Sequence, residues 1–377
     1  MNPFLPFNRP YLTGRELEYV RQAAERAHLS GDGGFTRLCH GWLERQVGCR
    51  KALLTHSGTA ALEMCALLAD IQPGDEIVMP SFTFVSTANA FVLRGGVPVF
   101  VDVDPDTLTI DPAAAAAAVG PRTRAVVAVH YAGVACAMDE LTALAHDRSL
   151  LLIEDAAQAL GSTFGARPLG SFGPLAATSF HETKNIISGE GGALLINDER
   201  FVERAEVVRE KGTNRRRFLA GEVDKYTWVD VGSSFLPSEI TAAFLWAQME
   251  EAERITTDRR SVWESYYQRC ETLHRRGVLR RPIIPRGCVH NAHMFYVLLE
   301  SEAVRTRAIA GLADAGVNAV FHYVPLHSSP AGRRLGRAAG ALAVTDLASA
   351  RLLRLPLWVG MSAGDVDRIV SVLERLL

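Results

Sequence analysis

With 377 residues, the chain is long enough to form two unequal domains, each with its own hydrophobic core. Hydrophobic residues make up 48% of the sequence and charged residues 22%, which is the composition of an ordinary globular protein. The 40 basic and 42 acidic residues leave a net charge of −2, which excludes the strong positive field used to bind nucleic acid or anionic lipid. We therefore expect small molecules as its ligands.

Six cysteines are scattered along the chain, and no two form a CxxC pair. Such spacing is typical of a protein from a reducing compartment and not of a disulfide framework. The first residues, MNPFLPFNRPYL, lack the charged and apolar regions of a secretory signal, and no apolar run is long enough to span a membrane. We expect a cytoplasmic protein with no membrane partner.

Short apolar runs alternate with helical patterns from about residue 45 to residue 200. The strand candidates are rich in Val, Ile and Leu on both faces, which predicts an α/β fold with a mostly parallel sheet between layers of helices. The alanine run at 113–118 predicts a helix, because alanine has the highest helix propensity. The runs at 176–181 and 191–198 predict two strands around the loop that holds Lys184.

The second half of the chain begins with a helical pattern at about 237–273, which predicts one long connecting helix. The remainder predicts a smaller α/β unit, with a strand at 292–300, a helix at 306–316, a strand at 318–326 and closing helices. We therefore predict a large domain of residues 1–250 and a small C-terminal domain of residues 251–377.

Asp155 is the first candidate for chemistry, since it ends the buried-strand candidate LLLIED. In open α/β sheets, ligands bind at the carboxyl ends of the strands. A buried carboxylate needs a partner, and a protonated pyridine nitrogen would be a suitable one. The alternative is structural, with Asp155 capping a helix formed by the residues that follow.

Lys184 is the second candidate, because an apolar strand candidate precedes it and glycines follow it. In that setting the lysine would enter a cleft and be partly desolvated, which lowers its pKa and suits imine chemistry. Ser179, five residues earlier, could donate a hydrogen bond to a phosphate. The alternative is an ordinary solvated lysine.

A strand candidate, a turn and a helix meet in the segment THSGTAALE at 55–63. Free N–H groups at the start of a helix bind anions, and Gly58 permits a close approach of the backbone. The alternative is a plain N-cap. Phe84, after the next strand candidate, could stack on a flat ring or pack in the core.

These segments occur in the order seen in the DegT/StrS-type nucleotide-sugar aminotransferases, and nearly the whole chain resembles that family. The resemblance is carried by PFNRPYLTGREL, SGDGGFTRLCHGWLE, SGTAALE, PGDEIVMPSFTFVSTANA, VFVDVDPDT, VHYAGVACAMD, EDAAQALGS, SFHETKN, HYVPLH and LRLPL. It implies a fold-type I transferase dependent on pyridoxal phosphate. The phrases SGDGGFTR and VDKYTW are most similar to the group of bacterial dTDP-4-amino-4,6-dideoxygalactose transaminases.

The resemblance implies roles for the catalytic and ring-binding residues. Lys184 would carry the cofactor as a Schiff base and move the proton between the donor carbon and the cofactor carbon. Asp155 would pair with the pyridinium nitrogen and keep the ring an electron sink. Gln158 would lie on the side of the phenolic oxygen, and Phe84 would stack on the ring.

The resemblance also implies a phosphate site made of Gly58, Thr59 and Ser179. Many relatives add an asparagine from the neighbouring subunit in a GYNYRMS-like segment. The segment here is GSSFLPS, with Ser234 at the asparagine position. A hydroxyl has a shorter reach, so we expect a weaker contact from Ser234.

His322 and Tyr323, in HYVPLH, are implied to lie at the sugar-nucleotide end of the cleft. The alternative is zinc, drawing on this motif and on HNAH at 290–293, but no complete ligand set with zinc-like spacing is present in the sequence, and we predict no metal. The basic segment 211–225 is either a solvated surface or a binding site for a diphosphate.

The implied reaction moves an amino group from an amino acid, expected to be L-glutamate, to C4 of a dTDP-linked 4-keto-6-deoxysugar. Two alternatives share the fold: a sugar dehydratase, whose relatives replace the Schiff-base lysine with histidine, and a non-catalytic regulator. We expect a homodimer with shared active sites, because the long polar stretch 211–234 suits an interface better than a core.

Overall fold

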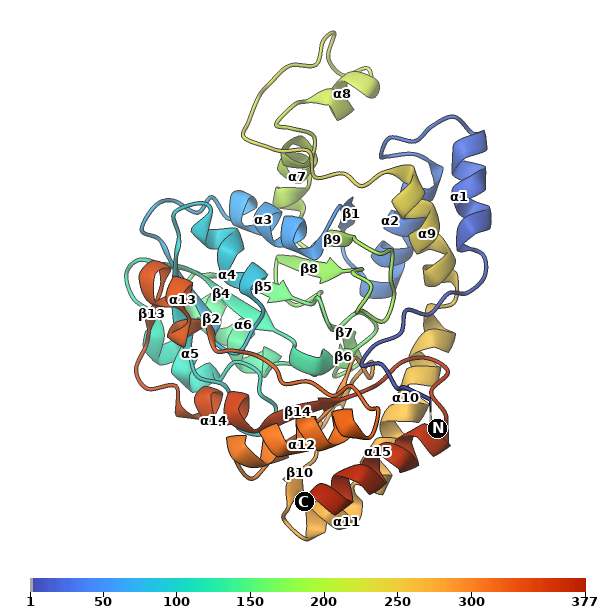
Figure 1. Ribbon diagram of the computed structural model, residues 1–377. Coiled ribbons are helices and arrows are strands. Elements are labelled where there is room, and N and C mark those ends of the chain that lie inside the picture. The colour runs from blue at the N-terminus through green and yellow to red at the C-terminus, as the bar shows by residue number, and fades with distance from the viewer. Residues whose placement is uncertain (1–2) are drawn as a thin grey trace.

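The computed structural model describes residues 3–377, with an eight-stranded sheet at its centre (Figure 1). The strands lie in the order β1-β9-β8-β5-β4-β2-β3-β13. Their bounds are Lys51–Thr55 (β1), Glu76–Pro80 (β2), Val97–Val101 (β3), Thr123–Val129 (β4), Leu151–Asp155 (β5), Leu175–Ser179 (β8), Gly192–Ile196 (β9) and Arg337–Ala338 (β13).

Five neighbouring pairs in this sheet are parallel, from β13 at one edge through to β8. Only β9 runs against its two neighbours, β8 and β1. The predicted mostly parallel sheet is therefore confirmed. The two strands predicted around the Lys184 loop are β8 and β9, so Lys184 lies in the connection between paired antiparallel strands.

Helices cover both faces of the sheet, because successive strand residues point to opposite sides. On β2, Ile77 and Met79 pack against α3 (Gly58–Leu68) and α4 (Val85–Val92), whereas Val78 packs against α5 (Pro112–Ala118) and α6 (Met138–Asp147). The predicted alanine helix is α5. A third group of helices covers β1, β8 and β9: α1 (Glu16–Glu25), α2 (Gly34–Val47) and α9 (Glu239–Glu250).

A second core forms around a three-stranded antiparallel sheet of β10 (Leu279–Arg280), β12 (Phe295–Leu299) and β14 (Leu352–Leu355). Helices α10 (Ala252–Arg269), α12 (Glu302–Asp314), α14 (Ala343–Arg351) and α15 (Ala363–Leu376) accompany it. The N-terminal segment also joins this part, through a bridge between Leu5 and Val317. The predicted boundary between residues 250 and 251 stays a prediction.

The remaining elements are short. They are β6 (Thr163–Phe164), β7 (Arg167–Pro168), β11 (Cys288–Val289), α7 (Val202–Arg209), α8 (Arg215–Leu219), α11 (Glu271–Arg275) and α13 (Pro330–Leu335), together with single 3-10 turns at Tyr131–Gly133, Glu199–Phe201 and Leu326–Ser328. No helix within residues 3–377 is both long enough and apolar enough to cross a membrane.

The single long helix predicted at 237–273 is three helices in the structure. The first begins at Glu239, after the N-cap Ser238, and ends at Glu250. Glu251 has φ −107° and ψ 10°, outside the α-helical region, so the chain turns before α10 begins. A further break at Cys270 separates α10 from α11. The periodic pattern continues through both breaks, which is why the sequence did not predict them.

The strand predicted at 318–326 is wrong. Only Val320 pairs with another strand, through an isolated bridge to Arg354. Beyond it, the carbonyl of Tyr323 accepts a hydrogen bond from the Ser349 hydroxyl at 2.5 Å, and Pro325 has no N–H to donate to a ladder. The segment instead forms an irregular wall between the two sheets.

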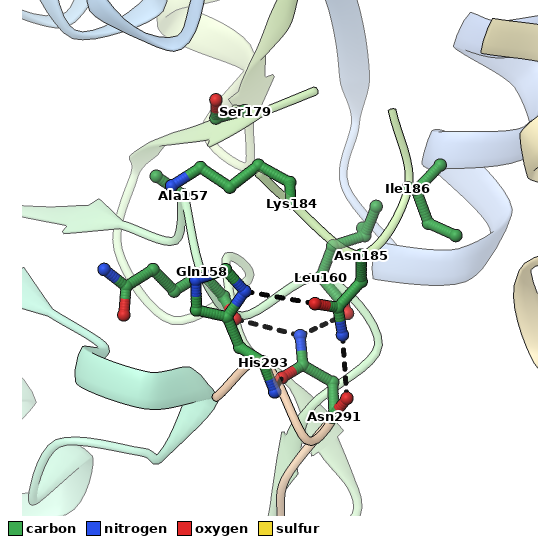
Figure 2. A pocket seen from close by; sticks show the side chains of 9 residues that line it. All are labelled: Ala157, Gln158, Leu160, Ser179, Lys184, Asn185, Ile186, Asn291 and His293. Atoms are coloured by element: carbon green, nitrogen blue, oxygen red, sulfur yellow. Dashed lines mark hydrogen bonds between the residues drawn. The ribbon is translucent and has the colours of Figure 1, made fainter. Parts of the chain in front are cut away.

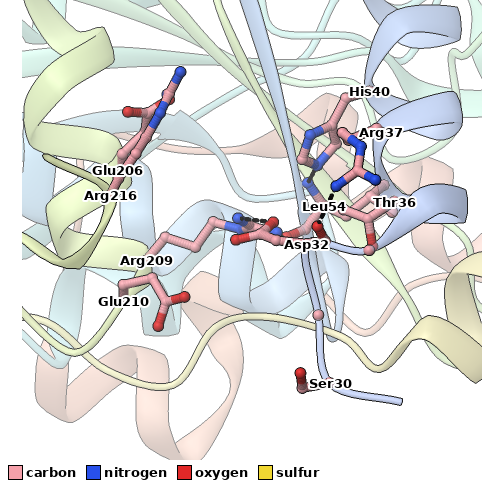
Figure 3. A network of polar contacts seen from close by, with 12 residues as sticks. Ser30, Asp32, Thr36, Arg37, His40, Leu54, Glu206, Arg209, Glu210 and Arg216 are labelled. Carbon is pink, nitrogen blue, oxygen red and sulfur yellow. Dashed lines mark hydrogen bonds and ion pairs between the residues drawn. The ribbon is translucent and has the colours of Figure 1, made fainter. Parts of the chain in front are cut away.

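The outer edge of β1 is closed by side chains, which Figure 3 shows. The N–H of Leu54 donates to Nε2 of His40 at 2.9 Å, and Nε of Arg209 donates to the carbonyl of Leu54 at 2.9 Å. Arg209 also pairs with Asp32 at 2.7 Å. Because His40 accepts at Nε2, its ring is neutral, and burial lowers its pKa well below the usual value. The outward-facing N–H and carbonyl of Leu54 thus have hydrogen-bond partners without a further strand at this edge.

Glu239, the first residue of α9, fixes the start of α2. Its buried carboxylate accepts from the N–H groups of Gly33 at 3.1 Å, Phe35 at 2.8 Å and Thr36 at 2.9 Å, and from the Thr36 hydroxyl. The side chain therefore satisfies backbone donors that have no partner inside the helix.

We predict that Glu239→Ala lowers the free energy of unfolding by about 3 kcal/mol, because several buried N–H groups lose their acceptor at once. Urea unfolding followed by circular dichroism measures the change. Glu253→Ala, at an exposed position in the first turn of α10, is the matched control and should change stability little. A loss below about 1 kcal/mol in the Glu239 variant would show that water replaces the carboxylate.

Candidate active site

The carboxyl ends of β4, β5 and β8 open into a cavity of about 680 Å³. Residues 321–324 and Arg354 of β14 close it from the side of the small sheet. Nine of the ten predicted site residues line this cavity: Gly58, Thr59, Phe84, Asp155, Gln158, Ser179, Lys184, His322 and Tyr323. Side chains far apart in the sequence therefore meet at the predicted edge of the sheet.

Ser234, the tenth residue, does not line the cavity. It is exposed and pairs with Glu210 through an isolated β-bridge. Its segment, residues 211–234 with helix α8, projects from the top of the molecule in Figure 1. A contact between Ser234 and the cavity of a second subunit stays a prediction.

Asp155 ends β5 and is buried, with 7% of its surface exposed. Its Oδ2 accepts from the Thr87 hydroxyl at 2.7 Å, and its Oδ1 accepts from the Ala157 N–H at 3.1 Å. Since Thr87 donates to Asp155, the hydroxyl of Thr83, 2.9 Å away, must donate to Thr87. The residues after Asp155 form a turn and no helix, so Asp155 is not the helix cap that the sequence left open.

Lys184 reaches the same cavity from the loop between β8 and β9, and Figure 2 shows its side chain extended across the pocket toward Ala157. Burial lowers the pKa of Lys184 to about 8, although the negative charge of Asp155 raises it; the positive charge of Arg354 lowers it further. At neutral pH the amine is therefore mostly protonated, with an unprotonated minority far larger than for an ordinary lysine.

The anion-binding turn predicted at 57–59 is present at the start of α3. The Ser57 hydroxyl caps the helix by accepting from the Ala60 N–H at 3.0 Å. A Cβ on Gly58 would lie 2.8 Å from Cβ of Ser179, and one on Gly192 would lie 2.4 Å from the Ser57 carbonyl oxygen. Both positions therefore require glycine, and together they bring Ser179 against the helix start.

The hydroxyl of Thr59 lies 2.7 Å from that of Ser86, at the start of α4. Hydroxyl groups from three elements thus surround the N-terminus of α3, where the helix dipole favours an anion.

A hydrogen-bonded network supports the floor of the cavity beside Lys184 (Figure 2). Nδ2 of Asn185 donates to the Asn291 carbonyl at 2.7 Å, so Oδ1 of Asn185 accepts from Nδ1 of His293 at 3.0 Å. Nε2 of His293 is then an acceptor. Burial, with the nearby charge of Lys184, lowers the pKa of His293 well below its usual value, which keeps the ring neutral.

Another wall of the cavity carries Gln158, His322 and Tyr323, with the phenol of Tyr131 buried behind them. Gln158 accepts from the Ala132 N–H at 2.7 Å and donates to the Tyr323 hydroxyl at 3.1 Å. The Tyr131 hydroxyl lies 3.0 Å from Nδ1 of His322. Burial raises the pKa of both tyrosines, so their hydroxyls stay protonated and this wall is neutral.

The cavity fits pyridoxal phosphate. Asp155 offers a buried carboxylate to a pyridinium nitrogen, Lys184 offers an amine, and the start of α3 offers N–H groups and hydroxyls to a phosphate. Phe84, which is 56% exposed, leaves a ring free at the cavity wall.

Several residues of this cavity were not predicted to have a role: Phe7, Ser86, Thr87, His181, His293 and Arg354. Ser86 and Thr87 lie in the first turn of α4, next to Phe84, and that position was the one available signal. His293 was considered only as part of the zinc alternative, and the sequence offered no comparable signal for Phe7, His181 or Arg354.

The histidines considered for zinc take other partners. His322 contacts Tyr131, His293 contacts Asn185, and His290 packs against Trp263 with ring centroids 4.4 Å apart. Residues 3–377 contain no cluster of three or more His, Cys, Asp or Glu side chains arranged to hold a metal.

The sequence model of the DegT/DnrJ/EryC1/StrS aminotransferase family matches residues 10–374. GDP-perosamine synthase of Caulobacter vibrioides is 31% identical over 379 residues, which cover 100% of this chain and 99% of that protein. The structure of the aminotransferase TlmJ of Streptoalloteichus hindustanus superposes with a TM-score of 0.89 at 29% identity, covering 100% and 98% of the two chains. DesV of S. venezuelae superposes with a TM-score of 0.88 at 25% identity, covering 99% and 98%.

We predict that an amine reagent such as trinitrobenzenesulfonate modifies Lys184 of the cofactor-free protein with a pH midpoint near 8. In Asp155→Asn the midpoint should move to lower pH, because the carboxylate that stabilises the ammonium form is lost. Peptide mass mapping measures the extent at each pH, and exposed Lys225 serves as the internal reference. A midpoint that moves to higher pH in Asp155→Asn would contradict the proposed coupling of the two charges.

Proposed function

The chain belongs to the DegT/DnrJ/EryC1/StrS aminotransferase family of pyridoxal-phosphate enzymes, and we propose that it moves an amino group from L-glutamate to the C4 ketone of a dTDP-linked 4-keto-6-deoxysugar. The observation that carries the proposal is the shared cavity of Lys184 and Asp155, a buried amine and a buried carboxylate at the carboxyl edge of the sheet. The name of GDP-perosamine synthase, to which the chain is similar, supports a nucleotide-linked sugar as the acceptor.

When bound, the cofactor supplies an electron sink for the charge left on carbon as a proton departs. Asp155 would hold a proton on the pyridine nitrogen, with Thr87 orienting its carboxylate. Lys184 would hold the cofactor through its amine, and the same amine would take up and return the proton that moves between the reacting carbons.

The remaining contacts hold the cofactor in one orientation. Gly58, Thr59 and Ser179 would bind the phosphate at the start of α3. Phe84 would pack on the face of the ring. Gln158 lies on the side of the phenolic oxygen, where its amide is fixed by hydrogen bonds to Ala132 and Tyr323.

The mouth of the cavity suits a nucleotide sugar. Phe321 and Val324 are 52% and 60% exposed, and they flank His322 and Tyr323. An apolar rim next to hydroxyl and imidazole groups can contact both a base and a sugar ring. The dTDP group is favoured by the resemblance of SGDGGFTR and VDKYTW, whereas the name of GDP-perosamine synthase indicates the GDP-linked alternative.

The two rival functions on this fold differ at the lysine. A sugar dehydratase of the related type would carry a histidine in place of Lys184, and a regulator would have no need of a lysine of lowered pKa beside Asp155. We keep a cytoplasmic location as part of the proposal, on the cysteine pattern of the sequence.

We predict that the purified enzyme, supplied with glutamate, aminates dTDP-4-keto-6-deoxyglucose and uses the GDP-linked ketosugar less well. Product formation is followed by chromatography, and NMR coupling constants report whether the new amine is axial or equatorial. Lys184→Ala should lose at least about 10²–10⁴-fold in rate, because acid–base help from the amine disappears. Preference for pyruvate or oxaloacetate would overturn the sugar acceptor, and preference for the GDP sugar would overturn dTDP.

We also propose a homodimer in which segment 211–234 of each subunit reaches the cavity of the other. Trp228 is 78% exposed, and Leu219, Tyr226 and Val229 are exposed beside it. Lys211 and the three arginines of the segment are paired within the chain, such as Arg215 with Glu210 at 2.8 Å. The segment is therefore held out as an ordered projection with apolar and aromatic side chains free for contact, which is typical of an interface.

We predict that subunits mixed after reversible dissociation restore activity when one carries Lys184→Ala and the other carries Tyr226→Ala and Trp228→Ala. Random mixing of equal amounts should give about one quarter of the wild-type rate, since half of the dimers hold one intact site. The matched control mixes Lys184→Ala with Asp155→Asn. Both of those residues line the cavity of one chain, so mixed dimers should not recover. Absence of recovery in the first mixture, with mixed dimers confirmed, would mean that each chain builds its site alone.

A further inference from the structure

Arg354 is the cavity residue that the roles above leave unexplained. It lies on β14, opposite Tyr296 of β12. Side chains of β14 alternate: Leu353 and Leu355 enter the core of the small sheet, whereas Leu352 packs toward the large sheet. Arg354 is two residues from Leu352 on the strand, so its side chain points to the same face. It therefore faces the large sheet, where it lines the cavity.

The guanidinium of Arg354 has no anionic partner within residues 3–377. Burial lowers the pKa of the guanidinium, whereas the nearby phenol groups of Tyr131 and Tyr323 raise it. Its Nε is buried and makes no hydrogen bond. The ring of Phe7 lies 4.5 Å from the guanidinium carbon and provides only a weak cation–π contact.

This arrangement is costly for the folded protein. The side chain is half-buried with its Nε fully enclosed, and a largely desolvated charge without a counter-ion destabilises a folded protein. The positive charge of Arg354 also helps to lower the pKa of Lys184 and the pKa of His322. The wall beside Lys184 therefore has an excess of positive charge that a bound anion would relieve.

Two anions can be set aside by position. The cofactor phosphate belongs at the start of α3, on the large sheet, with Thr59 and Ser179. A diphosphate is attached at C1 of the sugar, across the ring from a reacting C4, and so lies toward the mouth of the cavity. By contrast, the α-carboxylate of an amino acid is separated from its reacting nitrogen by a single carbon atom, and it must lie close to Lys184.

We propose that Arg354 binds the α-carboxylate of the amino-acid donor and is thereby a specificity residue for the first half of the reaction. The proposal rests on the aminotransferase function above. A planar guanidinium can form two parallel hydrogen bonds to a carboxylate, which fixes the orientation of the donor as well as its affinity.

Binding of glutarate to the holoenzyme tests this role, because glutarate has a donor-like carboxylate and no amine with which to react. Isothermal titration should show that Arg354→Gln weakens glutarate binding by about 10- to 100-fold, the range expected for a lost charged hydrogen-bonding pair. Arg354→Lys should lose less than Arg354→Gln, since the charge remains. Arg307→Gln, at an exposed site on α12, removes the same charge elsewhere and should leave binding unchanged. Titration with dTDP should give the same affinity in wild type and Arg354→Gln.

Thermal unfolding separates this role from a structural one. Because the guanidinium is unpaired in the free protein, Arg354→Gln should raise the melting temperature or leave it unchanged, whereas a structural arginine would lower it. Loss of dTDP affinity with unchanged glutarate affinity would assign Arg354 to the nucleotide and overturn the proposal. A lower melting temperature with unchanged glutarate affinity, or no measurable binding of glutarate by the wild type, would also overturn it. Failure of the sugar assay alone would refute the proposed acceptor and leave the glutarate result intact.

Discussion

The burial of one amine and one carboxylate in the same cavity is the constraint on which the site depends. Either charge alone would be expensive to desolvate, and each lowers the cost of the other. Asp155 offsets part of the effect of burial on Lys184, and the pKa of the amine therefore falls only to about 8. An amine with that pKa can lose and regain a proton near neutral pH, which is what proton transfer between two carbons requires.

The sheet holds Asp155 in place through its neighbour on the other face. Successive residues of β5 point in opposite directions, so Glu154 faces away from the cavity. The Glu154 carboxylate is fully buried and accepts from the N–H groups of Gly170 at 2.8 Å and Gly173 at 2.7 Å, while His130 lies 2.9 Å away. One residue thus anchors the end of the strand, and the next presents a carboxylate to the ligand. This division explains why two acidic residues occur together at the end of an otherwise apolar run.

The sequence predicted those parts of the site that follow from local pattern. Asp155 and Lys184 each adjoin a strongly apolar strand, and the Ser57–Thr59 turn joins a strand to a helix, so their position at one edge of the sheet followed from the parallel topology. Arg354 gave no such signal, because an arginine in LRLPL is equally consistent with a solvent-facing strand residue. The direction of its side chain depends on which face of β14 meets the large sheet, and that is a property of domain packing. The strand wrongly predicted at 318–326 has the same origin, since residues 321–324 line the cavity and only Val320 of this segment pairs with a strand.

The site binds two different substrates in turn, and its anion-binding group, Arg354, must therefore stay free of a carboxylate from the chain itself. If a carboxylate of the chain were paired with Arg354, it would compete with the first substrate for the guanidinium and would remain in the cavity when the second arrived. The neutral side chains of Gln158 and Tyr323 avoid this competition, since an amide and a protonated hydroxyl can contact either a carboxylate or sugar hydroxyls. The unpaired guanidinium of Arg354 then lowers the stability of the free protein by an amount that the protein tolerates. Binding of a donor carboxylate removes this destabilisation. The balance of charge around Lys184 is therefore completed by the substrate and not by the fold alone.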